Sequence, residues 1–112
     1  MLARANRLVT PADFRTTLRR GRRDSRETMV VSVAPSSPGD PARFGFVVTK
    51  KVGNAVIRNL VRRRLKAVAR ELVDGGVRGI DVVVRPLPAS VDAGWAALRD
   101  ELRSVVEGSD GR

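Results

Sequence analysis

The stretch KKVGNAVIRNLVRRRLKAVAR, residues 50–70, carries eight basic residues and no acidic one. Like charges on neighbouring helical turns repel each other, so a fold that gathers them needs a compensating gain. In this stretch and just after it, apolar residues recur at helical spacing, which predicts a helix over about 55–73. They fall in one sector of that helix: Ile57, Leu60, Val61, Leu65, Val68 and Leu72. Burial of that sector against a sheet supplies roughly 1.5–3 kcal/mol per fully buried large side chain.

The opposite sector of this helix is cationic, and we interpret it as a contact surface for nucleic acid. Lys50 and Lys51 precede the helix, at the end of an expected strand, and Asn54 is placed to cap it. A solvated surface usually mixes charges of both signs, and this one does not. The candidate nucleic-acid-binding residues are Lys50, Lys51, Asn54, Arg58, Asn59, Arg62, Arg63, Lys66 and Arg70. Arg64 falls within the apolar sector, where its stem can lie at the edge with the charge in water, and it has no assigned role.

Composition narrows the possible functions. The chain has 112 residues and a formal charge of +10, which predicts one domain over 1–112 and a polyanionic partner, nucleic acid before an anionic membrane. It contains no cysteine and no histidine, so disulfides, thiol nucleophiles, histidine catalysis and cysteine or histidine metal sites are excluded. No apolar run reaches transmembrane length, and the N-terminus lacks the apolar core of a signal peptide. We therefore expect a cytoplasmic protein without a membrane partner.

The remaining elements follow from local signals. Thr10 and Pro11 predict the start of a helix over 11–20, in which Asp13 is placed for a capping-box contact and Val9 and Phe14 for a hydrophobic staple. Period-two alternation and turn residues predict strands in 27–35, 43–51 and 80–88, a further short strand within 22–27, and a last helix over 90–108 with Trp95 in the core. Residues 1–9 are expected to be a flexible lead-in and 107–112 a flexible tail. The fold class is α+β, a sandwich of three helices on a small mixed sheet of about four strands.

Signatures of an enzyme active site are absent from the sequence. It contains no phosphate-binding glycine loop, no GxSxG motif and no cluster of metal ligands. We interpret the acidic residues as caps and surface charges: Asp13, Asp24, Glu27, Asp100, Glu101 and Glu107. The polypeptide therefore has no evident means of hydrolysing a substrate by itself.

Three segments resemble the bacterial ribonuclease P protein subunit. FGFVVTKKVGNAVIRNLVRRRLKAVARE, residues 44–71, is similar to that family's central signature, a strand, then Ser/Thr-Lys-Lys-x-Gly-x-Ala-Val-x-Arg-Asn, then a basic helix. NRLVTPADFRTTLRRGRR, residues 6–23, resembles the family's start, and RGIDVVVRPLP, residues 78–88, resembles its last strand. The resemblance thus extends over nearly the whole chain.

The resemblance implies a division of labour between protein and RNA. In that family a large RNA subunit with bound Mg²⁺ is the catalyst, and the protein, which holds no cofactor, binds that RNA and the 5′ leader of precursor tRNA. The holoenzyme removes the leader to give the mature 5′ end. The resemblance also implies an uncommon left-handed βαβ crossover, against the usual right-handed rule.

The resemblance further implies where each RNA is bound. The family's RNA-facing motif matches Lys50, Lys51, Asn54, Arg58, Asn59, Arg62, Arg63 and Lys66. Leu60 stands where the second arginine of the family's Arg-Asn-Arg is usual. The leader-binding cleft of the family matches Phe14, Leu18, Val30 and Ser32. Only Phe14 is aromatic among them, so we expect weaker stacking on leader bases, and Phe14 itself is open to two readings, staple or substrate contact.

Two other functions compete with this one. A structural RNA-binding protein, such as a ribosomal component, would share the size and charge, but the spacing of the central motif favours the ribonuclease P subunit. A protein-only nuclease is disfavoured because the acidic residues lack a metal-binding arrangement.

Overall fold

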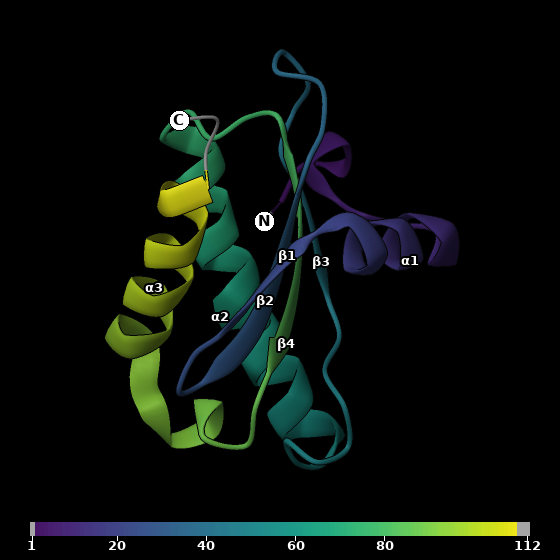
Figure 1. Cartoon of the computed structure of the whole chain (residues 1–112). Coiled ribbons are helices and arrows are strands. Elements are labelled where there is room, and N and C mark those ends of the chain that lie inside the picture. The colour runs from purple at the N-terminus through teal and green to yellow at the C-terminus, as the bar shows by residue number, and fades with distance from the viewer. Residues whose placement is uncertain (1, 110–112) are drawn as a thin grey trace.

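The computed structural model describes residues 2–109, in which three helices pack against a four-stranded sheet (Figure 1). The elements in chain order are the short 3-10 helix η1 (Arg4–Asn6), α1 (Pro11–Arg20), β1 (Arg22–Ser25), β2 (Met29–Pro35), β3 (Arg43–Phe46), α2 (Ala55–Asp74), β4 (Ile80–Pro86) and α3 (Ser90–Ser109). The predicted α+β class, three helices and four strands are confirmed, including the short strand expected within 22–27.

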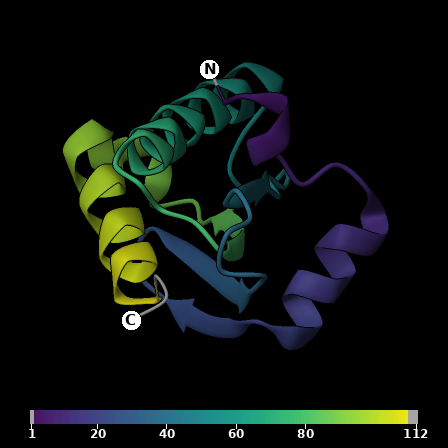
Figure 2. The ribbon, with the colours of Figure 1, turned by 90° about the horizontal axis from the view of Figure 1, so that it is seen from above.

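The sheet is mixed, with strand order β1-β2-β4-β3. The pairs β1–β2 and β2–β4 are antiparallel, and β3–β4 is parallel, with α2 as the crossover between the two parallel strands. Viewed from the α2 side with these strands pointing up, β4 lies to the left of β3, so the crossover has the left hand that the resemblance implies (Figures 1 and 2). β1 and β3 are the two edge strands.

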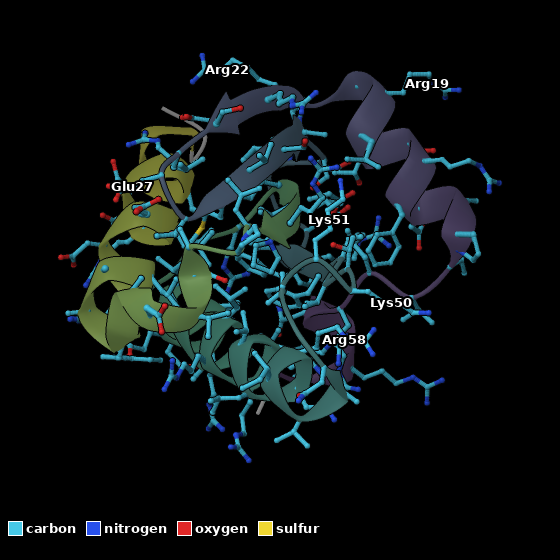
Figure 3. The ribbon with its side chains drawn as sticks, turned by 90° about the horizontal axis from the view of Figure 1, so that it is seen from below. Arg19, Arg22, Glu27, Lys50, Lys51 and Arg58 are labelled. Carbon is cyan, nitrogen blue, oxygen red and sulfur yellow. The ribbon has the colours of Figure 1, made fainter. Side chains whose placement is uncertain are left out.

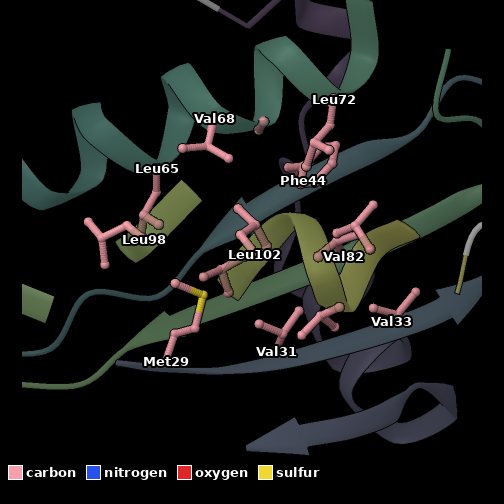
Figure 4. Close-up of a cluster of buried hydrophobic side chains, with 14 of the residues drawn as sticks. Met29, Val31, Val33, Phe44, Leu65, Val68, Leu72, Val82, Leu98 and Leu102 are labelled. Carbon is pink, nitrogen blue, oxygen red and sulfur yellow. The ribbon is translucent and has the colours of Figure 1, made fainter. Parts of the chain in front are cut away.

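Two layers of helices cover the sheet. α2 and α3 lie together on one face and α1 lies on the other (Figure 2). The main core fills the space under α2 and α3, where the inward residues of the strands meet those of both helices (Figure 4). On β2, Met29, Val31 and Val33 face this core while Val30 faces α1, as period-two alternation predicts.

The predicted helix starts are confirmed. Thr10 Oγ1 accepts a hydrogen bond from the Asp13 backbone N–H (3.1 Å), and Asn54 Oδ1 accepts one from the Ile57 N–H (3.0 Å). The staple is wrong: Val9 is 68% exposed, and Leu8 is buried in its place. The Leu8 N–H donates to the Phe44 carbonyl (3.0 Å), which fixes Leu8 inward, and in an extended segment the next side chain then points outward.

Residues 2–8 are held by contacts with the rest of the chain, contrary to the expected flexible lead-in. Leu2 is only 3% exposed, and Asn6 Nδ2 donates to the Ala42 carbonyl (2.8 Å). Arg7 forms a parallel bridge with Phe44, so this segment covers part of the outer edge of β3. Apolar Leu2 and Leu8 explain why a basic segment docks here.

The last helix differs from the prediction at both ends. Gly94 (φ +79°, ψ 169°) interrupts α3, and Trp95 directly after it is 39% exposed, so its expected place in the core is wrong. Leu98, Leu102 and Val105 are buried, as their spacing predicts. The helix continues to Ser109, so 107–109 belong to it, and residues 110–112 of the expected tail lie outside the described residues.

Candidate RNA-binding surface and leader cleft

Six basic side chains are presented by α2 and the turn before it. The expected strand over 43–51 ends at Phe46, so Lys50 and Lys51 lie in a turn closed by the hydrogen bond from the Val52 N–H to the Thr49 carbonyl (3.1 Å). Figure 3 shows Lys50, Lys51 and Arg58 close to this turn and the first turns of α2. We call the set the α2 cationic surface: Lys50, Lys51, Arg58, Arg62, Arg63 and Lys66.

This surface keeps its charge. Within residues 2–109 none of its six members forms an ion pair with a carboxylate. Arg62 is held instead by a neutral acceptor, since its Nη1 donates to Asn59 Oδ1 (2.8 Å). Arg58 is half-buried with its Nε enclosed, so packing orients it. Fixed but uncompensated guanidinium groups are suited to phosphate, which they can bind in a bidentate manner.

Arg70 stands apart from the other predicted RNA-binding residues. Its Nε lies 3.7 Å from Asp74 Oδ2, with both side chains largely exposed. The chain's own carboxylate therefore offsets part of the Arg70 charge. Arg64 is half-buried, in keeping with the edge position expected from the helical wheel.

A cleft of about 270 Å³ lies between α1 and the sheet. Three of the four residues predicted for the leader cleft line it: Leu18 from α1, and Val30 and Ser32 from β2. Phe14 does not line it. Its ring lies over Gly45, where an added Cβ would come within 2.5 Å of the Phe14 ring atoms Cε2 and Cζ. This close approach at Gly45 places Phe14 in a neighbouring hollow beside β3.

Two arginines that sequence reasoning missed line the same cleft. Arg23 pairs with Ser32 across β1–β2, and Arg85 pairs with Val30 across β2–β4, so all four residues share the α1 face of the sheet. Neither arginine forms an ion pair among the described residues. Alternation along 80–86 could have found Arg85, because it puts the residue on the face opposite to the buried Val82 and Val84.

An ion-pair network fixes α1 against this face. Arg43 donates from Nε and Nη2 to the two carboxylate oxygens of Asp81 (2.9 Å each), and from Nη1 to Asp13 Oδ2 (3.4 Å). The hydrogen bond with Asp81 raises the pKa of the Arg43 guanidinium above its usual value. Asp13, expected in a capping box, is thus turned to the sheet through its carboxylate, and only its N–H serves the cap.

Two further acidic side chains also have structural roles. Asp24 pairs with Arg26 through two hydrogen bonds, and Glu101 Oε1 accepts from the Thr28 N–H (3.1 Å). Within residues 2–109 no three side chains of the metal-ligating types Asp, Glu, His and Cys come together. The α2 cationic surface offers guanidinium and ammonium groups that can donate hydrogen bonds to phosphate. The cleft offers two guanidinium groups and apolar walls.

Known proteins with the same sequence pattern and fold are ribonuclease P proteins. The family model described as Ribonuclease P matches residues 2–109. The ribonuclease P protein component of Clavibacter michiganensis is 49% identical over 106 residues, covering 95% of this chain and 94% of that protein, and the one from Pseudarthrobacter chlorophenolicus is 50% identical over 108 residues, covering 96% and 79%.

Solved structures agree with the sequence matches. The ribonuclease P protein from Thermotoga maritima superposes with a TM-score of 0.78 at 27% identity, covering 91% of this chain and 96% of that one. The one from Staphylococcus aureus gives a TM-score of 0.81 at 24% identity, covering 95% and 96%, and shows the shared fold. The match of the family model over residues 2–109, with relatives at about half identity over nearly the whole chain, shows that this chain belongs to the ribonuclease P protein component family.

Proposed function

We propose that this protein is the subunit of ribonuclease P that binds the catalytic RNA through the α2 cationic surface and the 5′ leader of precursor tRNA through the cleft beneath α1. The holoenzyme then removes the leader with Mg²⁺ to give the mature tRNA 5′ end. The observation that carries the proposal is the set of six basic side chains on α2 and the turn before it, without an ion-pairing carboxylate among the described residues.

The cleft chemistry supports a leader of variable sequence. Its walls are the apolar Leu18, Val30 and Val83, and its cations are Arg23 and Arg85. Such a cleft holds a strand by its phosphates and its flat base surfaces and has few groups that read base edges. Since no aromatic ring lines it, we expect the two arginines to contribute more to leader affinity than stacking does.

The chemical step belongs, in this proposal, to the RNA subunit and its Mg²⁺. The chain has no histidine or cysteine, and its described carboxylates do not gather as metal ligands. A cationic protein between two RNAs lessens their mutual repulsion, a task that Mg²⁺ otherwise performs. The protein should therefore lower the Mg²⁺ concentration that cleavage requires.

No helix within residues 2–109 is long and apolar enough to span a membrane. We propose a cytoplasmic location, where tRNA precursors are processed.

A reconstitution assay tests this function. Cleavage of precursor tRNA by the cognate RNA subunit is measured over a range of Mg²⁺ concentrations, with and without the protein. We expect the protein to restore cleavage at low Mg²⁺ and to cleave nothing alone. Absence of stimulation, or cleavage by the protein alone, would overturn the proposal. Co-purification with ribosomal subunits in place of the RNA subunit would favour a structural ribosomal role.

A further inference from the structure

α1 lies across the direction of the strands and is attached to the sheet near each of its ends (Figure 1). At its far end, Gly21 lies so close to β2 that an added Cβ would stand 3.2 Å from the carbonyl carbon and oxygen of Val33. Near its start, the Asp13 carboxylate accepts a hydrogen bond from Arg43 of β3 (3.4 Å). The first attachment is backbone packing, whereas the second depends on a side chain from another element.

Arg43 is a fixed point on the sheet, because most of its hydrogen-bonding capacity is committed to the neighbouring strand. Its Nε and Nη2 donate to both carboxylate oxygens of Asp81 on β4, and this bidentate geometry fixes the direction of the guanidinium group. Arg43 and Asp81 are also partners in the parallel β3–β4 register, and the Asp81 side chain is only 14% exposed. Nη1 then meets the carboxylate of Asp13. We call Asp13, Arg43 and Asp81 the α1 clamp.

The turn of α1 that the clamp steadies carries one wall of the leader cleft. Leu18 is the α1 residue in the lining of the cleft, and it is 53% exposed, so its place depends on the helix that carries it. Val30 and Ser32 of β2 belong to the sheet side of the same cleft. Thr17, directly before Leu18, is buried, and its Oγ1 donates to the Asp13 carbonyl (2.9 Å). The position of Asp13 over the sheet therefore helps to set the width of the cleft.

We propose that Arg43 is a positioning residue for the 5′ leader, which acts by holding α1 at a fixed distance from β2. Arg43 does not line the cleft itself, so it acts through Asp13 and not through a contact with RNA. The inference rests on the proposed function of the cleft as the leader site. A cleft of fixed width binds a strand with less entropic cost than one whose wall must be ordered on binding.

Asp13→Asn tests the clamp, because it releases α1 and leaves the pair of Arg43 with Asp81 in place. The substitution also raises the net charge of the protein by one, which strengthens its general attraction for RNA. Loss of the clamp and gain of charge therefore predict opposite changes in affinity. Asp24→Asn is the matched control, since Asp24 has the same side-chain exposure as Asp13 (32% each) and also binds an arginine. Asp24 pairs with Val31 across β1–β2, on the face away from the cleft.

The assay measures the affinity of the assembled holoenzyme for two precursor tRNAs that differ only in their leader, one nucleotide or about eight nucleotides long. We expect the wild type to bind the long leader more tightly. Asp13→Asn should reduce this advantage about threefold, the effect of a partly exposed ion pair, and Asp24→Asn should leave it unchanged. Both variants should bind the RNA subunit alone as tightly as the wild type or slightly more tightly. An undiminished advantage in Asp13→Asn, or equal weakening of both precursors, would overturn the proposal.

Arg43→Lys provides a second variant that keeps the charge. A lysine ammonium is a compact point donor and cannot form the bidentate pair with Asp81 while it also holds Asp13. We expect the same loss of leader advantage as in Asp13→Asn, and no further loss when the two substitutions are combined, because both break one link. Additive losses would show two separate effects and would contradict the clamp.

The position of α1 can be measured directly in the free protein, without RNA. The chain contains no cysteine, so Thr16→Cys on α1 and Ser104→Cys on α3, both at exposed positions, introduce two unique sites for spin labels. The distribution of distances between the labels should be broader in Asp13→Asn than in Asp24→Asn. Equal distributions in these two variants would refute the positioning role, whatever the RNA measurements give.

Failure of this inference can be told apart from failure of the proposed function. If the wild-type holoenzyme binds both precursors equally, the assignment of the cleft to the leader is wrong, and the clamp positions no leader. If the wild type prefers the long leader and Asp13→Asn prefers it to the same extent, the cleft keeps its proposed function and the positioning role of Arg43 alone is wrong.

Discussion

The salt dependence of RNA binding is where the α2 cationic surface can be tested most sharply. The logarithm of affinity falls with the logarithm of salt concentration with a slope of about −0.9 per phosphate neutralised. If all six members of the surface contact phosphates, the wild-type slope is about −5. Tripling the salt should then lower the affinity for the RNA subunit by more than two orders of magnitude.

Two variants on the same helix separate contact from general charge. Arg62 is positioned by Asn59 Oδ1 and has no described ion pair, whereas Arg70 lies beside Asp74. Arg62→Gln and Arg70→Gln change the formal charge equally, so long-range attraction falls equally in both. Loss of one phosphate contact should flatten the slope by about 0.9 for Arg62→Gln, and the change for Arg70→Gln should be clearly smaller.

The assay is equilibrium binding of the labelled RNA subunit at salt concentrations from roughly 0.1 to 0.5 M, at fixed Mg²⁺. Circular dichroism of both variants should match the wild type, because the two side chains are outside the core. Two outcomes would refute the distinction between paired and unpaired arginines on α2. One is a salt slope for Arg62→Gln equal to that of the wild type. The other is a slope that is flatter than that of the wild type by the same amount in both variants.

Two further outcomes are expected. Gly45→Ala should lower the free energy of unfolding by about 1–3 kcal/mol, because its Cβ would stand 2.5 Å from the Phe14 ring, as measured by urea denaturation; Gly39→Ala, where a Cβ meets nothing within 4 Å, is the control and should change it little. RNA-subunit affinity should vary less than about twofold between pH 6 and 7.5, since the basic surface contains only Arg and Lys and the chain has no histidine. A steep pH profile would show that a group outside this surface governs binding.

Helical periodicity and capping residues predicted α1 and α2 almost to the residue. The reason is that local signals decide helix ends: Thr10 and Asn54 accept the hydrogen bonds expected of caps, and the apolar sector of α2 is the buried one. The N-terminal segment escaped prediction because its docking depends on a partner far along the chain. Asn6 bonds to Ala42, and no pattern within residues 2–8 specifies that carbonyl.

The candidate site, too, could be predicted from sequence only where one local element carries it. The basic residues of α2 could be named from sequence because one helix carries most of them on one face. The cleft could be named only through the resemblance, and incompletely, since Arg23 and Arg85 reach it from two strands that are not sequence neighbours. Phe14 lies in a different hollow from the other three residues expected in the cleft, because its ring packs on the bare backbone at Gly45, a tertiary contact.

Six arginines within residues 2–109 fall into two classes by what holds them. Carboxylates of the chain itself bind Arg26, Arg43, Arg99 and Arg103. The Arg43 pairs join β3 to β4 and α1 to the sheet, and the Arg99 pair joins α3 to α2. The Arg26 and Arg103 pairs each brace one turn. Arg7 and Arg62 are bound by a carbonyl and an amide oxygen, which orient the side chain and leave its charge intact. The more exposed pairs, Arg99–Glu71 and Arg103–Glu107, add little stability, and in each of them a carboxylate offsets the charge of the arginine. Placing a carboxylate beside an unpaired arginine, for example beside Arg62 by Asn59→Asp, should therefore weaken RNA binding more than the loss of a paired arginine such as Arg103. This is expected although Asn59→Asp adds an ion pair to the protein.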